Sequence, residues 1–309
     1  MPSWNDVLEE IQAAGSTHDL IRRNYLKQLY DYTGRNVIAY YSGWLQKGQM
    51  QREGVVGFEV NDGDKDGFMA TIHELDRSKG LDLILHTPGG ETAATESLVD
   101  YLHSMFGTNI RAIVPHAALS AGTMIALAGN EIVMGKHSSL GPIDPQIFGM
   151  PAHGIVEEFQ RAADEVQKNP ARIPLWQPII AKYHPTLIGE AEKSIKWSAQ
   201  MVKAWLVNGM FAGDADAATK ADRVLQELGD HALTLSHARH ISLQKAKDIG
   251  LKVVALEDDQ WLQDAVLTVH HVFVQTLTAT RAIKIIENHN GIAFINTVQL
   301  VAQVAPVHG

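Results

Sequence analysis

Residues 81–114 have the sequence LDLILHTPGGETAATESLVDYLHSMFGTNIRAIV. The apolar runs at 81–85 and 110–114 are short and rich in branched side chains, which is typical of buried strands. A turn at Pro88-Gly89-Gly90 follows the first run, and apolar residues at helical spacing extend from about Thr92 to Phe106. A strand, a helix and a second strand in this order predict a β-α-β unit, in which the strands are parallel and the crossover is right-handed.

The same pattern continues on both sides of this unit. A β-like run precedes it at 36–41, and a small apolar helix at 117–129 and a strand at 131–134 follow it. We therefore predict an α/β fold whose core is a parallel sheet of β-α-β units, with helical additions at the N- and C-terminal ends. Further helices are expected at 4–32 (a pair broken near 15–17), 68–77, 154–167, 173–183, 188–208, 215–228, 243–249 and 258–289, with β-like pieces at 232–235 and 253–255.

We expect one decorated domain, although a length of 309 residues would also allow two domains. The chain then divides into an N-terminal helical segment at 1–35, a core domain at 36–257 and a C-terminal helical extension at 258–309.

The composition argues against several classes of protein. The chain has 26 Lys and Arg against 35 Asp and Glu, so its net charge of −9 does not fit a nucleic-acid-binding surface, which needs clustered basic residues. It has no Cys, which removes disulfides, Cys-ligated metals and thiol nucleophiles and fits a reducing cytoplasm. There is no signal-peptide pattern and no uninterrupted apolar run of about 18 residues, so we expect a cytoplasmic protein without a membrane span.

Neither a metal nor a cofactor is expected. The chain has 15 His, but no pair of them has a metal-binding spacing on a convincing helix. The Gly-rich stretch at 42–67 contains no phosphate-binding motif of the nucleotide-binding proteins.

Two turns should lie at the carboxyl ends of the parallel strands, where open α/β sheets place their ligands. In the first, Pro88-Gly89-Gly90 allows bare backbone N–H groups to approach an anion. In the second, Ser120 stands at a helix start between Ala118 and Gly122. A serine there either caps the helix or acts as a nucleophile beside an oxyanion-binding N–H group, and the residues alone favour the cap.

Three segments in order resemble one group of proteins. They are LHTPGG at 85–90, ALSAGT at 118–123 and LGPIDPQ at 140–146. Together they are similar to the superfamily of the Clp protease proteolytic subunit and signal peptide peptidase A, which shares its fold with crotonase. The branch called serine dehydrogenase proteinases is the most similar, and the resemblance extends from about residue 36 over most of the chain.

The resemblance implies roles for particular residues. Ser120 takes the nucleophile position, and the N–H groups of Gly90 and Ala121, with Gly89 beside them, take the oxyanion-hole positions. The Clp subunits use Ser, His and Asp in chain order, but here the loop after the third strand offers Asp144 in place of a His. His237 lies where those subunits carry their Asp, so the roles look exchanged, and His240 is an alternative to His237.

A second possibility follows signal peptide peptidase A, whose base is a lysine downstream of the serine. Lys182 lies in a matching region, and a lysine base must be desolvated to lose its proton near neutral pH.

The function that the resemblance implies is a serine peptidase, which hydrolyses peptide bonds of a peptide or protein substrate through an acyl-enzyme. Members of the superfamily stack into rings, so a homo-oligomer is expected. Two alternatives stay open. One is a crotonase-like enzyme that polarises an acyl thioester, and the other is a non-catalytic oligomeric scaffold.

Overall fold

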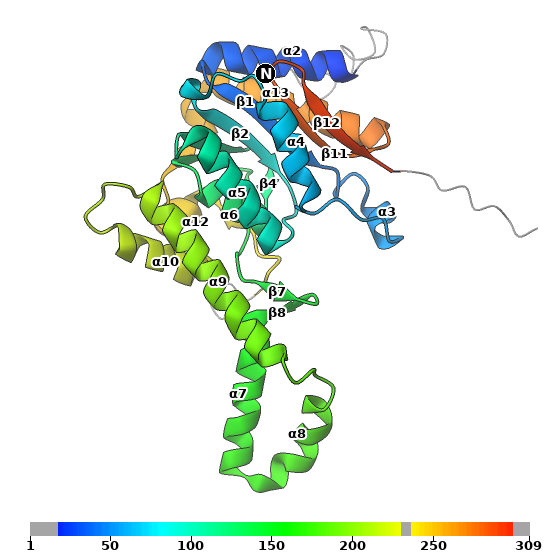
Figure 1. The fold of residues 1–309 in the computed structure, drawn as a ribbon, viewed down its shortest axis with the longest axis vertical. Coiled ribbons are helices and arrows are strands. Elements are labelled where there is room, and N and C mark those ends of the chain that lie inside the picture. Colours follow the sequence, from blue (N-terminus) through cyan, green and yellow to red (C-terminus); the bar gives the residue numbers. More distant parts are fainter. Residues whose placement is uncertain (1–17, 230–235, 299–309) are drawn as a thin grey trace, which may run out of the picture.

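A computed structural model of the chain describes residues 18–229 and 236–298. Its centre is a seven-stranded sheet in which most neighbouring strands are parallel (Figure 1). This confirms the α/β class with a mostly parallel core sheet. The strand order is β10 (Val253–Ala255), β5 (Glu131–Met134), β3 (Ile110–Val114), β2 (Leu81–His86), β1 (Asn36–Ser42), β11 (Ala282–Asn288) and β12 (Ala293–Thr297).

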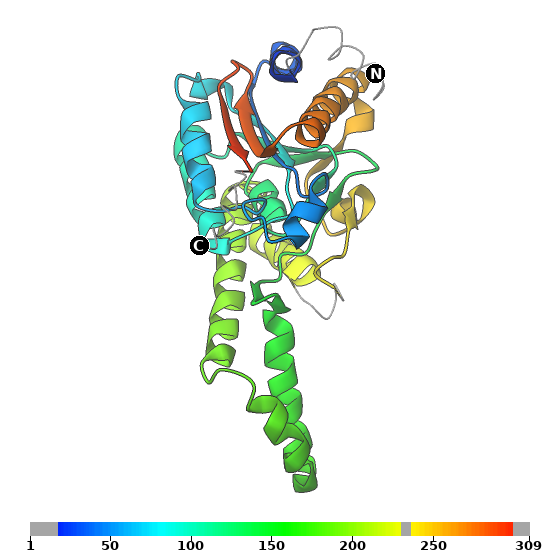
Figure 2. The ribbon, with the colours of Figure 1, turned by 90° about the vertical axis from the view of Figure 1, so that its right-hand side faces the viewer.

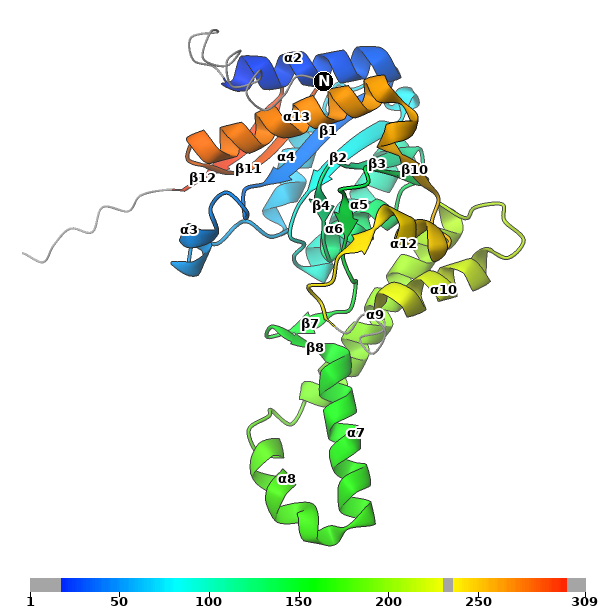
Figure 3. The same ribbon diagram turned by 180° about the vertical axis from the view of Figure 1, so that it is seen from behind.

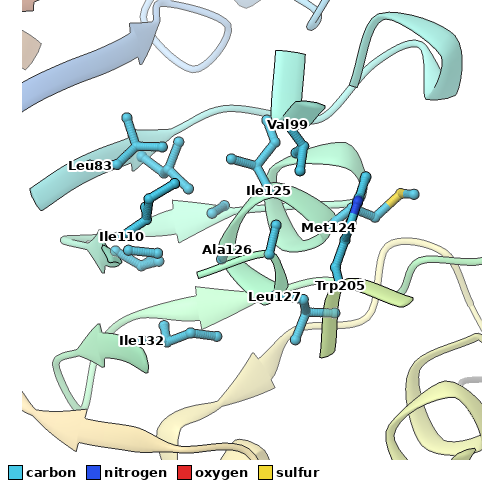
Figure 4. Packing of buried hydrophobic residues seen from close by; sticks show 14 of the residues in the cluster. Leu83, Val99, Ile110, Met124, Ile125, Ala126, Leu127, Ile132 and Trp205 are labelled. Atoms are coloured by element: carbon cyan, nitrogen blue, oxygen red, sulfur yellow. The ribbon is translucent and has the colours of Figure 1, made fainter. Parts of the chain in front are cut away.

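Both faces of the sheet are buried, and the side chains of each strand alternate between the two faces. In β1, Ile38 and Tyr40 contact the larger apolar cluster, whereas Val37, Ala39 and Tyr41 contact the smaller one. The larger cluster joins the sheet to α4 (Gly63–Ile72), α5 (Thr92–Phe106), α6 (Ala121–Leu127) and α9 (Leu187–Asn208), and Figure 4 shows its packing around Ile125 and Trp205. The smaller cluster joins it to α2 (His18–Thr33) and α13 (Gln260–Ala279), which lie together on the other face (Figure 3).

The C-terminal part differs from the sequence prediction. The helix predicted at 258–289 begins at Gln260 but ends at Ala279, and β11 then pairs antiparallel with β1. Charged Lys284 and Glu287 interrupt the apolar residues of β11 at a spacing that also suits a helix. Both are buried in a strand because each forms an ion pair with a residue of another element. The sequence pattern contains no information about those distant partners.

The N-terminal helix pair and one β-like piece are only partly covered by the structure. The second helix of the pair is α2, whereas the first helix and the β-like piece at 232–235 lie outside the described residues.

A helical arm extends away from the sheet along the long axis of the molecule (Figures 1 and 2). It consists of α7 (Ala152–Lys168), a short 3-10 turn (Pro170–Arg172), α8 (Ile173–Ile180) and the first part of α9, which packs against α7. The hairpin of β7 (Gln146–Ile147) and β8 (Met150–Pro151) joins this arm to the body. No helix in the described ranges is long and apolar enough to cross a membrane.

The remaining elements are short. A small second sheet contains β4 (Ala117–Ala118), β6 (Ser139–Leu140) and β9 (Ile241–Ser242), and it lies where the loops after β2 and β3 meet. The other elements are α3 (Gly48–Arg52), α10 (Ala217–Gly229), α12 (Leu243–Asp248) and the 3-10 turns Arg77–Lys79 and Leu256–Asp258.

Candidate active site

The loops at the carboxyl ends of β2 and β3 border a cavity of about 690 Å³. The loop after β6 and the irregular segment 56–61 complete its wall. Ser120, Asp144 and His237, which are far apart in sequence, all line this one cavity. The other lining residues are Val56, Gly57, Glu59, Asn61, Pro88, Gly89, Gly90, Glu91, Thr92, Met124, Ile143, Pro145 and Gln146.

Ser120 has an unusual backbone conformation. Its φ of 50° and ψ of −115° place it in a region that L-residues rarely adopt and that costs about 1–3 kcal/mol. Although it stands immediately before α6, its hydroxyl makes no capping hydrogen bond. The strained turn is held from both sides, because the Leu119 N–H donates to Thr87 O at 3.0 Å and the Gly122 N–H donates to Leu119 O at 2.8 Å. The serine is therefore not a simple helix cap.

His237 and Asp144 form a hydrogen-bonded pair. The distance from His237 Nδ1 to Asp144 Oδ1 is 2.8 Å, and the carboxylate is buried whereas the imidazole is 30% exposed. Because a carboxylate only accepts, Nδ1 donates in this bond, and in the neutral ring Nε2 is then the acceptor. The side-chain amide of Gln146 donates to the other carboxylate oxygen of Asp144, at 2.8 Å. The carboxylate is thus fixed by its neighbours and in turn fixes the ring.

The two glycines of the first turn are required by close backbone contacts. Gly89 has a φ of +102°, and a Cβ atom there would come within 2.6 Å of Ser120 Cβ. A Cβ atom on Gly90 would come within 2.2 Å of Val60 O. The turn therefore approaches the serine more closely than any side chain would allow.

The second oxyanion-hole position predicted from the sequence is the N–H group of Ala121. Ala121 is the first residue of α6, so its N–H has no acceptor within the helix. Its nitrogen would lie 3.0 Å from a Cβ atom on Gly89, so it stands next to the first turn.

The other two candidate bases lie elsewhere. Lys182 is exposed in the turn that follows α8 on the arm, and it does not line the cavity. His240 is also exposed and lies outside the cavity wall. Among the predicted site residues, the structure therefore brings Ser120, Asp144 and His237 together with the two glycines, and it leaves Lys182 apart.

Two parts of this site do not follow from the sequence. Gln146 lies in the segment at 140–146, but its contact with Asp144 depends on the turn between them. Segment 56–61 has the composition of an ordinary loop, and nothing in its spacing indicates that Val60 pairs with Gly90.

Three histidine rings lie close to one another, of which His86 is buried and His116 is exposed. His86 ends β2, His116 precedes β4 and His270 belongs to α13, and their ring centroids are 5.2–5.7 Å apart. Burial lowers the pKa of His86 to about 3, and burial also lowers the pKa values of His116 and His270. These rings are therefore neutral near pH 7. Within the described residues, no group of His, Asp or Glu side chains is arranged to hold a metal ion.

Two uncharacterised proteins of Methanocaldococcus jannaschii are similar to the chain, one with 30% identity over 190 residues and the other with 40% identity over 103 residues. The matched regions cover 62% and 33% of this chain but only 57% and 36% of those proteins. The chain thus spans about half of the first relative and about a third of the second.

Among solved structures, a mutant of the membrane-bound stomatin-specific protease 1510-N matches 67% of this chain and 79% of its own, with 18% sequence identity and a TM-score of 0.40. The profile of one family matches residues 20–288, which include both turns, the cavity loops and most of the sheet. By this match over most of its length, the chain belongs to the family of ClpP-like SDH-type serine proteinases.

Proposed function

We propose that the chain hydrolyses peptide bonds through an acyl-enzyme on Ser120. The observation that carries this proposal is the strained, non-capping Ser120 in the same cavity as the His237–Asp144 pair. Family membership supports a protein or peptide as substrate. A nucleophile, a base and an orienting carboxylate at one cavity are the parts that acyl transfer requires.

The proposed reaction has two halves. In the first, Ser120 Oγ attacks the scissile carbonyl while His237 Nε2 takes its proton, and Asp144 stabilises the imidazolium through Nδ1–H. The N–H groups of Gly90 and Ala121 bind the oxyanion that forms. His237 then gives its proton to the leaving amine, the C–N bond breaks and the acyl group stays on Ser120. In the second half, His237 takes a proton from water as the water oxygen attacks the ester carbonyl. It then returns this proton to Ser120 Oγ as the C–O bond to the serine breaks, which releases the carboxylic acid and the free serine.

The placement of Lys182 supports His237 as the base. A lysine becomes a base near neutral pH only when burial disfavours its charge, and Lys182 is exposed. His237, in contrast, lines the cavity and is held there by its hydrogen bond to Asp144.

The test is intact-mass spectrometry after reaction with an alkyl fluorophosphonate. We expect one adduct on the wild type, none on Ser120→Ala, and labelling slowed by about 10²–10⁴-fold in His237→Ala. Lys182→Ala and His240→Ala serve as controls and should label at the wild-type rate. Loss of labelling in Lys182→Ala but not in His237→Ala would contradict the assignment of the base. A folded wild type that never reacts would favour the thioester or scaffold alternatives.

We also propose that the protein is a homo-oligomer. Large apolar side chains are exposed on the arm and its hairpin, including Phe148 (89%), Leu175 (56%) and Ile173 (46%). Exposed apolar groups of this size favour burial against another surface. Sedimentation velocity should show a mass above one chain, and Leu175→Glu should lower it. The cytoplasmic location expected from the sequence stays a prediction, which cell fractionation would check.

A further inference from the structure

The Gly89–Gly90 peptide is oriented by Val60. The Val60 N–H donates to Gly89 O at 2.7 Å, and the Glu91 N–H donates to Val60 O at 2.9 Å. The described chain has no cis peptide bonds, so the C=O and N–H groups of the Gly89–Gly90 peptide point in opposite directions. Because Gly89 O points toward Val60, the Gly90 N–H points away from it. Neither of these two hydrogen bonds involves the Gly90 N–H.

The segment that contains Val60 has no regular secondary structure of its own, so other groups must hold it. A buried ion pair does so on both sides of Val60. Lys284 Nζ donates to Glu59 O at 2.7 Å, and Asp64 Oδ2 accepts the Asn61 N–H at 3.0 Å. The neighbours of Val60 in sequence are thus each tied to one member of the pair.

The pair itself is well satisfied. Lys284 Nζ and Asp64 Oδ1 are 2.7 Å apart, both side chains are 1% exposed, and the Tyr40 hydroxyl donates to Asp64 Oδ2 at 2.8 Å. Apolar residues of similar volume often stabilise a protein as well as a buried ion pair does. What apolar residues cannot provide is a donor for Glu59 O and an acceptor for the Asn61 N–H.

We propose that Lys284 and Asp64 are positioning residues of the oxyanion hole. They hold the Glu59–Asn61 segment, through which Val60 orients the Gly89–Gly90 peptide so that its N–H meets the developing oxyanion. This inference rests on the proposed acyl transfer at Ser120. It means that the oxyanion hole also depends on Lys284 of the C-terminal strand β11, whose side chains do not line the cavity.

The test compares Lys284→Met/Asp64→Asn, which removes both charges, with the single variant Asp64→Asn, which keeps Lys284 as the donor to Glu59 O. The probe is an alkyl fluorophosphonate, whose phosphoryl oxygen occupies the oxyanion hole, and the maximal labelling rate is measured separately from the half-saturating concentration. We expect the maximal rate to fall about tenfold or more in the double variant and less in Asp64→Asn. The half-saturating concentration should change less than about twofold. The pH midpoint of labelling, which reports the base His237, should not move.

Arg22→Met is the matched control. Arg22 also forms a buried ion pair with β11, through Nε and Glu287 Oε2 at 2.6 Å, but within the described residues no hydrogen bond or ion pair joins either residue to segment 59–61. We expect this variant to lose stability and to keep the wild-type labelling rate per folded molecule. A general loosening of β11 would instead slow labelling in both variants alike.

The outcomes separate this inference from the proposed function. If the wild type labels at Ser120 and folded Lys284→Met/Asp64→Asn labels equally fast, only the positioning role is overturned. The same holds if Arg22→Met slows labelling as much as the double variant does. If Ser120 of the wild type does not react at all, both proposals fall together.

Discussion

The backbone of Ser120 carries strain that its side chain does not relieve. Glycine adopts a φ of 50° with a ψ of −115° at little cost, whereas the same conformation raises the free energy of Ser and of Ala. We predict that the free energy of unfolding is about 1 kcal/mol higher for Ser120→Gly than for Ser120→Ala. Neither variant should react with the fluorophosphonate. Urea denaturation of the two variants checks the difference in stability directly. Equal stability would show that the turn stores no strain at this residue.

Helix α6 and the turn after β2 pack without spare room. A Cβ atom on Gly122 would come within 2.5 Å of Thr87 Cγ2, so Gly122→Ala should lower the free energy of unfolding by about 1–3 kcal/mol. Thr87→Ser removes that methyl group and keeps the hydroxyl that accepts the Gly89 N–H. We expect Thr87→Ser to restore most of the stability that Gly122→Ala loses. Additive effects in this double-mutant cycle would contradict the contact.

For the whole molecule, the burial of His86 predicts a loss of stability in acid. His86 has a folded-state pKa of about 3 because of burial, and its value in the unfolded chain is 6.5. Between these values the unfolded chain binds more protons, so stability is full above about pH 6.5 and falls toward pH 3. Between about pH 3 and pH 6.5, His86→Phe should reduce the slope of the free energy of unfolding against pH by about 1.4 kcal/mol per pH unit. The exposed His73→Gln is the control, and an unchanged slope in His86→Phe would contradict the prediction.

The sequence predicts the sheet better than the parts that hold the site together. Strands such as β2 are local apolar runs, and their carboxyl-end turns identify Gly90 and Ser120 as neighbours by topology alone. Strand β11 was missed because the burial of Lys284 depends on Asp64, 220 residues away. The contact of Gln146 with Asp144 likewise depends on a turn that spacing does not specify.

The central claim is that Ser120 carries the acyl group, and trapping that intermediate tests it most directly. The protein would be mixed with a p-nitrophenyl acyl ester, quenched in acid within milliseconds and digested for peptide mass mapping. We predict a burst of nitrophenol equal to the protein concentration and an acyl mass increase on the peptide that contains Ser120, with neither in Ser120→Ala. An acyl group on another residue, or turnover without any acylated peptide, would contradict the account.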